Sequence, residues 1–280
     1  MRLLPIAAAL LLSATPACAD GLPPERLTAE ESEGQLLLIE KALAAGRMVQ
    51  TDAMLRWLEP RLVDGYRNRF NLLLAEYFLA REDAASAEAA IAPVDGALVD
   101  SCRFSGIWGW IAFQKRDWNR AIAMLANAVD ACPGDPGRWN LLGQALTKRG
   151  EYAASIEAFD AALTAAPFQA AVLNNRALSL AYSGEMARAI SDLEIAVAIA
   201  PENLAISDNL AFLRANAGLD MVKGPASDDA RTLAMAGEGA LAASRTGIAT
   251  SYFTQAVLAY DRFDPGLWRK ANGNFETGGE

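Results

Sequence analysis

PGRWNLLGQALTKRGEYAASIEAFDAALTAAPFQ, residues 136–169, is the stretch that decides the fold. Its first half places apolar residues at helical spacing on one face and ends at Gly150, a residue suited to the left-handed stop of a helix. Its second half carries another apolar stripe at the same spacing, and it closes at Pro167 because proline cannot continue a helix. The stretch therefore predicts two helices joined by a tight turn.

The same unit recurs along the chain with a period of 34 residues. Small residues keep this period at Ala75, Gly109, Gly143, Ala177 and Ala211. Two further series share it: Ala128, Ala162 and Ala196, and Pro133, Pro167 and Pro201. Small residues at fixed positions let two helix backbones approach closely, so the three series predict a stack of similar helical hairpins.

The pattern Trp139, Gly143, Tyr152, Phe159 and Pro167 resembles the tetratricopeptide repeat (TPR), a helix-turn-helix unit of 34 residues. The resemblance is specific for residues 102–218 and implies an all-α fold, an α-solenoid of TPR hairpins with divergent terminal hairpins. Within it, LNNRALSLAYSGEMARAI followed by DNLAFLRANAGL is similar to repeats in the TPR proteins of tight-adherence (Flp) pilus assembly, which are exported and help pilus machinery to form.

The composition excludes many kinds of chemistry. The 280 residues include no histidine and three cysteines, which removes imidazole bases and the usual zinc sites. A net charge of −9 disfavours nucleic acid as a partner. No phosphate-binding or dinucleotide-binding glycine motif is present. We therefore predict no catalytic residues, no metal site and no cofactor, and a protein or peptide as the partner.

The chain begins like an exported protein. Arg2 precedes an apolar run, Leu3 to Leu12, and Ala17-Cys18-Ala19 forms an A-x-A cleavage site. The run is shorter than the ~20 residues that span a bilayer, so it is not expected to be a membrane anchor. A lipid anchor on Cys18 is the alternative, although Thr15-Pro16-Ala17 lacks the aliphatic residue usual in a lipobox. The expected location is the periplasm or the cell exterior.

The expected organisation follows from these features. It is a signal peptide (1–19), a TPR solenoid (20–223), a linker (224–228), a divergent C-terminal helical hairpin (229–268) and a disordered tail (269–280).

Two groups of residues are candidates for partner binding. Trp110 and Phe113 avoid the core positions of their repeat and share the side of the helix that lines the concave groove of a TPR stack, so ligand contact and packing are both open. The asparagines Asn140, Asn174, Asn175 and Asn209 occupy two equivalent repeat positions on the same side. Their amides donate and accept, which suits either a peptide backbone or neighbouring helices. The groove shows no cluster of Lys and Arg of the kind that TPR sites use to clamp a C-terminal carboxylate.

Cys102 and Cys132 are the only cysteines left after cleavage of the predicted signal peptide. They lie at the start of a first helix and at the end of a second helix, and an antiparallel hairpin brings these ends together. An even number of cysteines in an oxidising compartment predicts a disulfide. The alternative is a pair of buried free thiols.

These features favour a non-catalytic exported adaptor that binds a protein or an extended peptide in its concave groove. An assembly or secretion accessory, for example in pilus biogenesis, is the alternative, and it would act through its convex face or by self-association. A subunit of an enzyme whose chemistry lies in a partner is a third possibility.

The processing of the N-terminus can be tested directly. We expect protein from the native host to start at Asp20 and to carry no lipid, because the apolar run is short and a cleavage site follows it. The measurement is the intact mass of the purified protein. A mass increment of a diacylglyceryl group on Cys18 would establish the anchored alternative instead.

Overall fold

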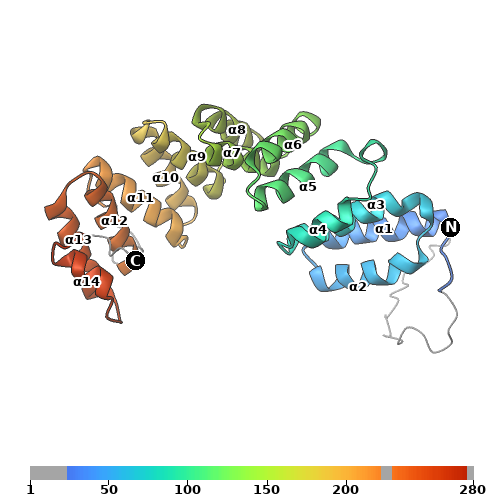
Figure 1. Ribbon diagram of the computed structural model, residues 1–280, viewed down its shortest axis with the longest axis horizontal. Coiled ribbons are helices and arrows are strands. Elements are labelled where there is room, and N and C mark those ends of the chain that lie inside the picture. Colours follow the sequence, from blue (N-terminus) through green and yellow to red (C-terminus); the bar gives the residue numbers. More distant parts are fainter. Residues whose placement is uncertain (1–23, 222–228, 276–280) are drawn as a thin grey trace, which may run out of the picture.

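The computed structural model describes residues 24–221 and 229–275, which form an arch of α-helices (Figure 1). No strand occurs in this part of the chain. The helices are α1 (Ala29–Ala44), α2 (Met48–Leu58), α3 (Arg67–Ala80), α4 (Ala84–Ile91), α5 (Ser101–Gln114), α6 (Trp118–Ala131), α7 (Pro136–Arg149), α8 (Tyr152–Ala165), α9 (Ala170–Tyr182), α10 (Met186–Ile199), α11 (Leu204–Ala217), α12 (Ala230–Ala242), α13 (Thr246–Ala259) and α14 (Pro265–Ala271). Three short 3-10 turns lie at Glu59–Arg61, Asp64–Tyr66 and Gly96–Leu98.

The helices pack as consecutive antiparallel hairpins. We call α1, α3, α5, α7, α9 and α11 first helices, and α2, α4, α6, α8 and α10 the second helices that pair with the first five of them. Successive first helices also contact one another, more than successive second helices do, so the first helices form the inner face of the arch. We call this surface the first-helix groove. The predicted all-α solenoid is confirmed.

Local sequence signals set the ends of the helices. At α7, the side chain of Asp135 accepts hydrogen bonds from the backbone N–H groups of Gly137 and Arg138, at 2.9 and 3.2 Å, which satisfies donors that lack a partner within the helix. The same helix ends at Gly150 with φ 85°, the left-handed conformation that glycine adopts without strain.

The two helices of a hairpin approach most closely at the small residues of the 34-residue series. A Cβ atom on Gly143 would lie 2.6 Å from the ring of Phe159, and one on Gly109 would lie 2.6 Å from Leu125. The same relation holds for Gly237 and Phe253, again at 2.6 Å. Each of these glycines makes room for a fully buried side chain 16 residues later. The small residues recur in the sequence because each hairpin repeats this contact.

The repeat changes its frame after α11. Gly237 follows Ala211, the last residue of the small series, by 26 residues and not by 34. Accordingly α12 packs on α11 as closely as the helices of one hairpin do, and it also pairs with α13. Gly239 permits this contact, because a Cβ there would lie 2.1 Å from the carbonyl oxygen of Phe212. The helices α12 and α13 thus form a divergent hairpin near the C-terminus.

The expected disorder of residues 269–280 is wrong for the part that the structure describes. α14 continues through Ala271, Leu267 is buried, and the ring of Phe275 lies 6.2 Å from that of Phe253. These apolar contacts hold the segment against the last hairpin. The predicted signal peptide with Cys18, the linker 224–228 and residues 276–280 lie outside the described residues. None of the described helices is both long and apolar enough to cross a bilayer.

Candidate functional site

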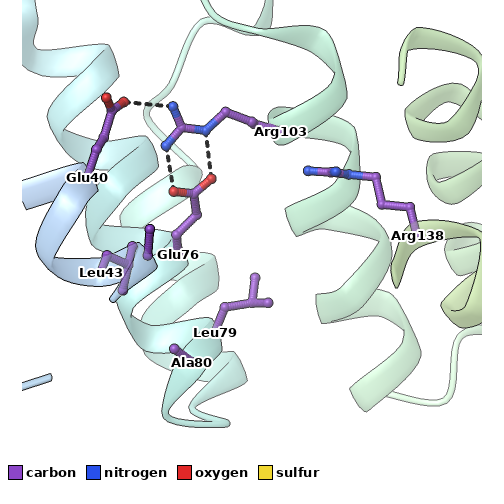
Figure 2. A pocket seen from close by; sticks show the side chains of 8 residues that line it. Glu40, Leu43, Glu76, Leu79, Ala80, Arg103 and Arg138 are labelled. Atoms are coloured by element: carbon purple, nitrogen blue, oxygen red, sulfur yellow. Dashed lines mark hydrogen bonds and ion pairs between the residues drawn. The ribbon is translucent and has the colours of Figure 1, made fainter. Parts of the chain in front are cut away.

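Two neighbouring clefts, of which Figure 2 shows the larger, open on the first-helix groove between α1, α3, α5 and α7. Their volumes are 520 and 350 Å³. Four residues line both clefts: Glu76, Leu79, Arg103 and Arg138. The larger cleft adds Glu40 and apolar residues of α1 and α3, and the smaller one adds Trp110, Ile107 and Leu141. The site therefore combines charged groups with an apolar wall.

Trp110 and Phe113 have different surroundings in the structure. Trp110 is half-buried and lines the smaller cleft. Phe113 is not among the residues that line either cleft; its ring packs edge-to-face on Trp118 at 5.4 Å. The Phe113 ring thus packs on an aromatic residue of the second helix, and partner contact at Trp110 and Phe113 stays a prediction.

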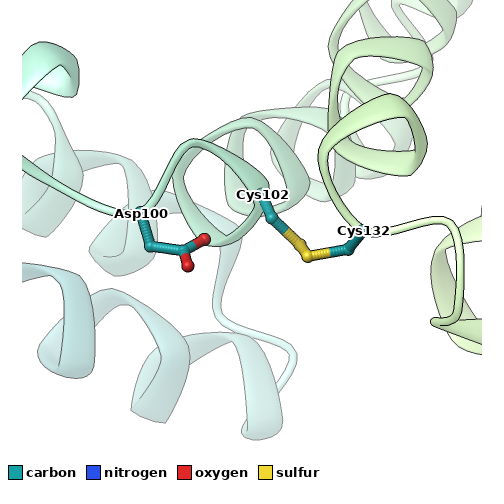
Figure 3. Close-up of side chains that lie close together, drawn as sticks. All are labelled: Asp100, Cys102 and Cys132. Carbon is teal, nitrogen blue, oxygen red and sulfur yellow. A yellow bond between two sulfur atoms is a disulfide. The ribbon is translucent and has the colours of Figure 1, made fainter.

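A cysteine pair joins the two helices next to the clefts. Cys102 at the start of α5 and Cys132 after the end of α6 have Cα atoms 5.8 Å apart and bonded sulfur atoms (Figure 3). Asp100 lies beside them, but its carboxylate caps α5 by accepting the backbone N–H of Arg103 at 2.8 Å. In the described part of the chain this trio is the one group with metal-ligand atoms close together, and the sulfur–sulfur bond leaves no thiolate for a metal.

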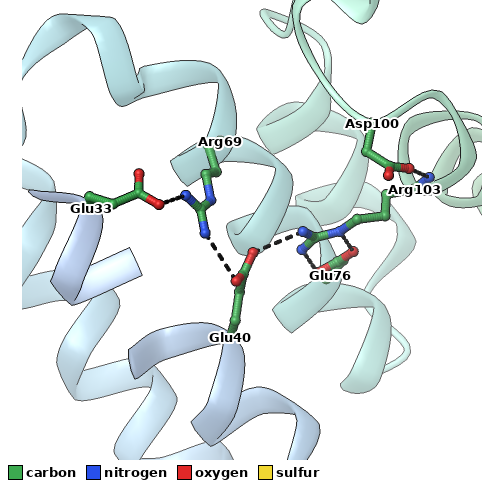
Figure 4. Close-up of polar contacts among 6 residues, drawn as sticks. All are labelled: Glu33, Glu40, Arg69, Glu76, Asp100 and Arg103. Atoms are coloured by element: carbon green, nitrogen blue, oxygen red, sulfur yellow. Dashed lines mark hydrogen bonds and ion pairs between the residues drawn. The ribbon is translucent and has the colours of Figure 1, made fainter. Parts of the chain in front are cut away.

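A chain of ion pairs crosses three first helices beside the clefts (Figure 4). Arg69 on α3 contacts Glu33 and Glu40 on α1, at 2.5 and 3.1 Å. Arg103 on α5 reaches Glu40 at 2.9 Å and clasps both oxygens of Glu76 on α3, at 2.7 and 2.5 Å. Such bidentate pairs fix geometry as well as charge. The chain thus ties α1, α3 and α5 together.

The ion pairs shift the pKa values of their members. The hydrogen bonds that Arg103 donates to Glu76 raise the pKa of Arg103 against the opposing effect of burial. Burial alone would raise the pKa of Glu40, but hydrogen bonds from Arg103 and Arg69 outweigh it and the pKa is lowered. Glu40 is therefore held as a carboxylate and is a weak base.

Arg138 on α7 points toward α5 (Figure 2), and it lines both clefts. One terminal nitrogen of its guanidinium pairs with Asp135, whereas its Nε atom is buried and has no hydrogen-bond partner. Burial lowers the pKa of Arg138, against the opposing effect of the Glu76 and Asp100 charges. This incomplete pairing contrasts with Arg103, whose three guanidinium nitrogens all have carboxylate partners.

The four asparagines form a chain of hydrogen bonds along the groove. Asn209 on α11 donates to Asn174 on α9 at 2.8 Å, Asn174 donates to Asn175 at 3.3 Å, and Asn175 donates to Asn140 on α7 at 3.1 Å. All four are half-buried. The amides link neighbouring first helices, and each has further donor or acceptor capacity beyond these bonds.

The sequence reasoning missed the charged half of the site. Arg69 and Arg103 are 34 residues apart and so occupy equivalent positions of the repeat, which was the available signal. Arg138 lies one residue beyond the next position of this 34-residue series. Glu40 and Glu76 are not separated by the repeat period either. The groove therefore does hold clustered arginines, although acidic partners balance most of their charge.

The fold and the groove define a class, the α-solenoid built from helical hairpins. The tetratricopeptide repeat family matches residues 108–170 and 140–204. A comparison with curated protein sequences gave no match. Residues 108–204 thus match the tetratricopeptide repeat family, and helical hairpins flank this central part on both sides.

Solved structures with this fold are similar over most of the chain. A tetratricopeptide repeat protein from Parabacteroides merdae is 11% identical with a TM-score of 0.53, covering 88% of this chain and 100% of that one. The APC/C hetero-tetramer Cut9-Hcn1 is 12% identical with a TM-score of 0.57, and the match covers 86% of this chain and 49% of that one. PilF of Pseudomonas aeruginosa is 19% identical with a TM-score of 0.48, and the match covers 82% of this chain and 92% of that one. At such identities the likeness concerns the fold alone.

The lowered pKa of Glu40 predicts a pH dependence of stability. A carboxyl group whose pKa is lower in the folded state stabilises the fold fully above its unfolded pKa, here about 4.5, and loses this effect as the pH falls through the folded value. Replacing Glu40→Gln should therefore lower the free energy of unfolding near pH 7, and the difference from the native protein should shrink below about pH 4.5. Urea denaturation across this range measures it. The exposed Glu157→Gln on α8 is the control, and equal pH profiles for both variants would contradict the prediction.

The disulfide remains a prediction for the protein in its own compartment. Peptide mapping without reductant should recover Cys102 and Cys132 as one linked pair. Because the bond closes a loop of 30 residues, reduction should cost on the order of 3–4 kcal/mol of unfolding free energy. Recovery of both residues as free thiols from oxidised protein would show that the bond does not form.

Proposed function

We propose that the protein is a non-catalytic exported adaptor that binds a protein partner through an extended peptide segment lying in the first-helix groove. The observation that carries the proposal is the pair of clefts in which the half-buried Trp110 and its apolar neighbours adjoin charged and amide groups. Apolar contact supplies affinity in such sites, and a few placed polar groups set orientation.

The asparagine chain supports an extended peptide as the occupant. A peptide backbone carries one hydrogen-bond donor and one acceptor at every residue except proline, and an asparagine amide can accept from the donor and donate to the acceptor. Asn140, Asn174, Asn175 and Asn209 extend this capacity from α7 to α11. A partner that follows the groove would meet an apolar anchor at α5 and amides further along.

The state of the cleft carboxylates supports a non-catalytic role. Proton transfer needs an acid or base whose pKa lies near the working pH. Glu40 and Glu76 both bind arginines, and the pKa of Glu40 is shifted away from neutrality. The chain has no histidine to take this part. Export is inferred from the N-terminal sequence described above.

An assembly or secretion accessory acting through the convex face is the second candidate. Large apolar side chains exposed on second helices favour it, among them Ile195 and Ile199 on α10, at 43% and 40% exposure. The sequence similarity to pilus-assembly TPR proteins points to the same candidate. Such a protein would bind through α6, α8 and α10 or through another copy of itself.

Substitution of Trp110→Ala distinguishes the two candidates. A partner is first captured from a periplasmic extract and identified by mass spectrometry, and its affinity is then measured by titration calorimetry. Truncation of an aromatic anchor typically costs ~2 kcal/mol or more, so the affinity should fall about 30-fold, with the helical circular dichroism unchanged. The double replacement of Asn174 and Asn175 by Ala should also weaken binding, and each lost interhelical hydrogen bond should cost about 0.5–1.5 kcal/mol of stability.

Ile195→Ala, on a second helix, is the matched control. We expect it to leave the affinity unchanged. If Ile195→Ala weakens binding while the groove variants do not, the convex-face candidate takes the place of the groove. If Trp110→Ala unfolds the protein, Trp110 belongs to the core and is not an anchor.

A further inference from the structure

An exposed apolar patch lies at the C-terminal end of the arch, where α13 passes into α14 (Figure 1). We call it the C-terminal patch, and its members are Leu258, Tyr260, Phe263 and Trp268. The rings of Phe263 and Trp268 lie 6.2 Å apart, so they form one aromatic surface. Leu267 in the same segment is buried, so the segment supplies the core as well and the patch is additional to it.

The C-terminal patch is unusual for the end of a repeat array. The last hairpin of such an array ordinarily presents a polar face to water, because no further repeat covers it. Here Leu258 and Phe263 are 81% and 73% exposed, and Trp268 is 50% exposed. Apolar side chains gathered in one place on the surface of a protein mark an interaction site.

The size of the C-terminal patch suits a small protein–protein interface. A buried aromatic side chain contributes about 150–250 Å², so the patch with its charged neighbours offers each copy about 500 Å². Two such surfaces together reach the area of about 1,000 Å² at which specific interfaces begin.

The charges within the patch are self-complementary. Asp261 and Arg262 are both exposed, and neither has an ion-pair partner within residues 24–221 and 229–275. In a two-fold symmetric pair, each residue meets its counterpart's neighbour in both directions. Asp261 of one copy can therefore pair with Arg262 of the second copy, and the same ion pair forms again across the axis.

A cleft of 390 Å³ adjoins the C-terminal patch. It lies between the start of α12 and the end of α13, and its lining includes Tyr260 together with Asp261 and Arg262. Phe263 follows directly after this lining and is exposed beside it. Interface aromatics typically fill pockets of the partner. A two-fold axis here would bring Phe263 of one copy to the cleft of the other.

Other occupants fit the C-terminal patch less well. Residues 276–280, which read ETGGE, carry no large apolar side chain that could cover it. Anionic membrane surfaces attract basic segments, whereas this chain has a net charge of −9 and the patch itself contains Asp261. A surface that carries both signs of charge next to its own aromatic residues matches a second copy.

We propose that the C-terminal patch is a two-fold symmetric interface between two copies of this chain, with Phe263 at its centre and Asp261 paired with Arg262 across the axis. The inference goes beyond the proposed function. The patch belongs to the end of α13 and to α14, whereas the clefts of the groove lie between α1, α3, α5 and α7.

The first test is the oligomeric state of the full mature chain by analytical ultracentrifugation. An interface of this size should give a monomer–dimer equilibrium with a Kd of about 10–100 µM. Phe263→Ser should weaken dimerisation by about 30-fold or more, with the helical circular dichroism unchanged. Phe168→Ser is the matched control, since Phe168 lies between α8 and α9 and is 76% exposed, and it should leave the equilibrium unchanged.

The second test exchanges the charges. Asp261→Arg alone and Arg262→Asp alone each place like charges opposite one another, so each variant should dimerise more weakly than the native chain. An equimolar mixture of these two variants should recover dimers, because each then meets the opposite charge. The double variant with both changes should dimerise as the native chain does. Failure of the mixture and of the double variant to recover would overturn the two-fold arrangement.

The remaining outcomes separate the interface from its alternatives. A chain that stays monomeric up to about 1 mM, or a dimer that Phe263→Ser leaves intact, would overturn the proposal. Binding of a monomeric chain to phosphatidylcholine vesicles, lost in Phe263→Ser, would assign the patch to a lipid surface instead. Trp110→Ala, which tests the groove, should leave dimerisation unchanged, so the two proposals can fail separately.

Discussion

The close contact between the two helices of each hairpin is the constraint on which the rest of the structure depends. At this contact one helix carries a residue with little or no side chain, and the other inserts a buried group, as Phe159 does over Gly143. Bulkier residues at Gly109 or Gly143 would push the helices apart. Because the contact recurs at the same place in successive hairpins, the hairpins stack regularly and their first helices lie on one inner face. The groove is a consequence of this spacing.

The fold was predictable because this contact leaves a periodic trace in the sequence. The series from Ala75 to Ala211 marks it, and Pro167 and Gly150 mark the ends of helices around it. The C-terminal tail was not predictable in the same way. Phe275 packs on Phe253 through a single aromatic contact that does not recur with the 34-residue period, so the periodic pattern of the sequence does not predict it. Single tertiary contacts of this kind override the polar composition of a terminal segment.

The position of the candidate site could be predicted from the sequence, but the hydrogen bonds and ion pairs within it could not. Repeat positions placed the asparagines on one face, yet only the structure shows that they bond to one another across 35 residues. Helical spacing placed Phe113 near Trp110, but three residues separate side chains by about 60° around a helix, which is enough for different neighbours. The ion pairs depend on the directions of long, flexible side chains. Those directions follow from the packing of α1, α3 and α5, which a pattern of residue types does not contain.

The change of frame after α11 affects how the molecule holds together as a linear array. In a regular repeat stack each hairpin contacts its neighbours through moderate interfaces, and end hairpins can open separately from the rest. Here α12 belongs to two pairs at once, since it packs on α11 through the bare backbone at Gly239 and on α13 through Phe253. The last hairpin can therefore not detach without exposing α11. We therefore expect this end of the array to unfold cooperatively together with α11.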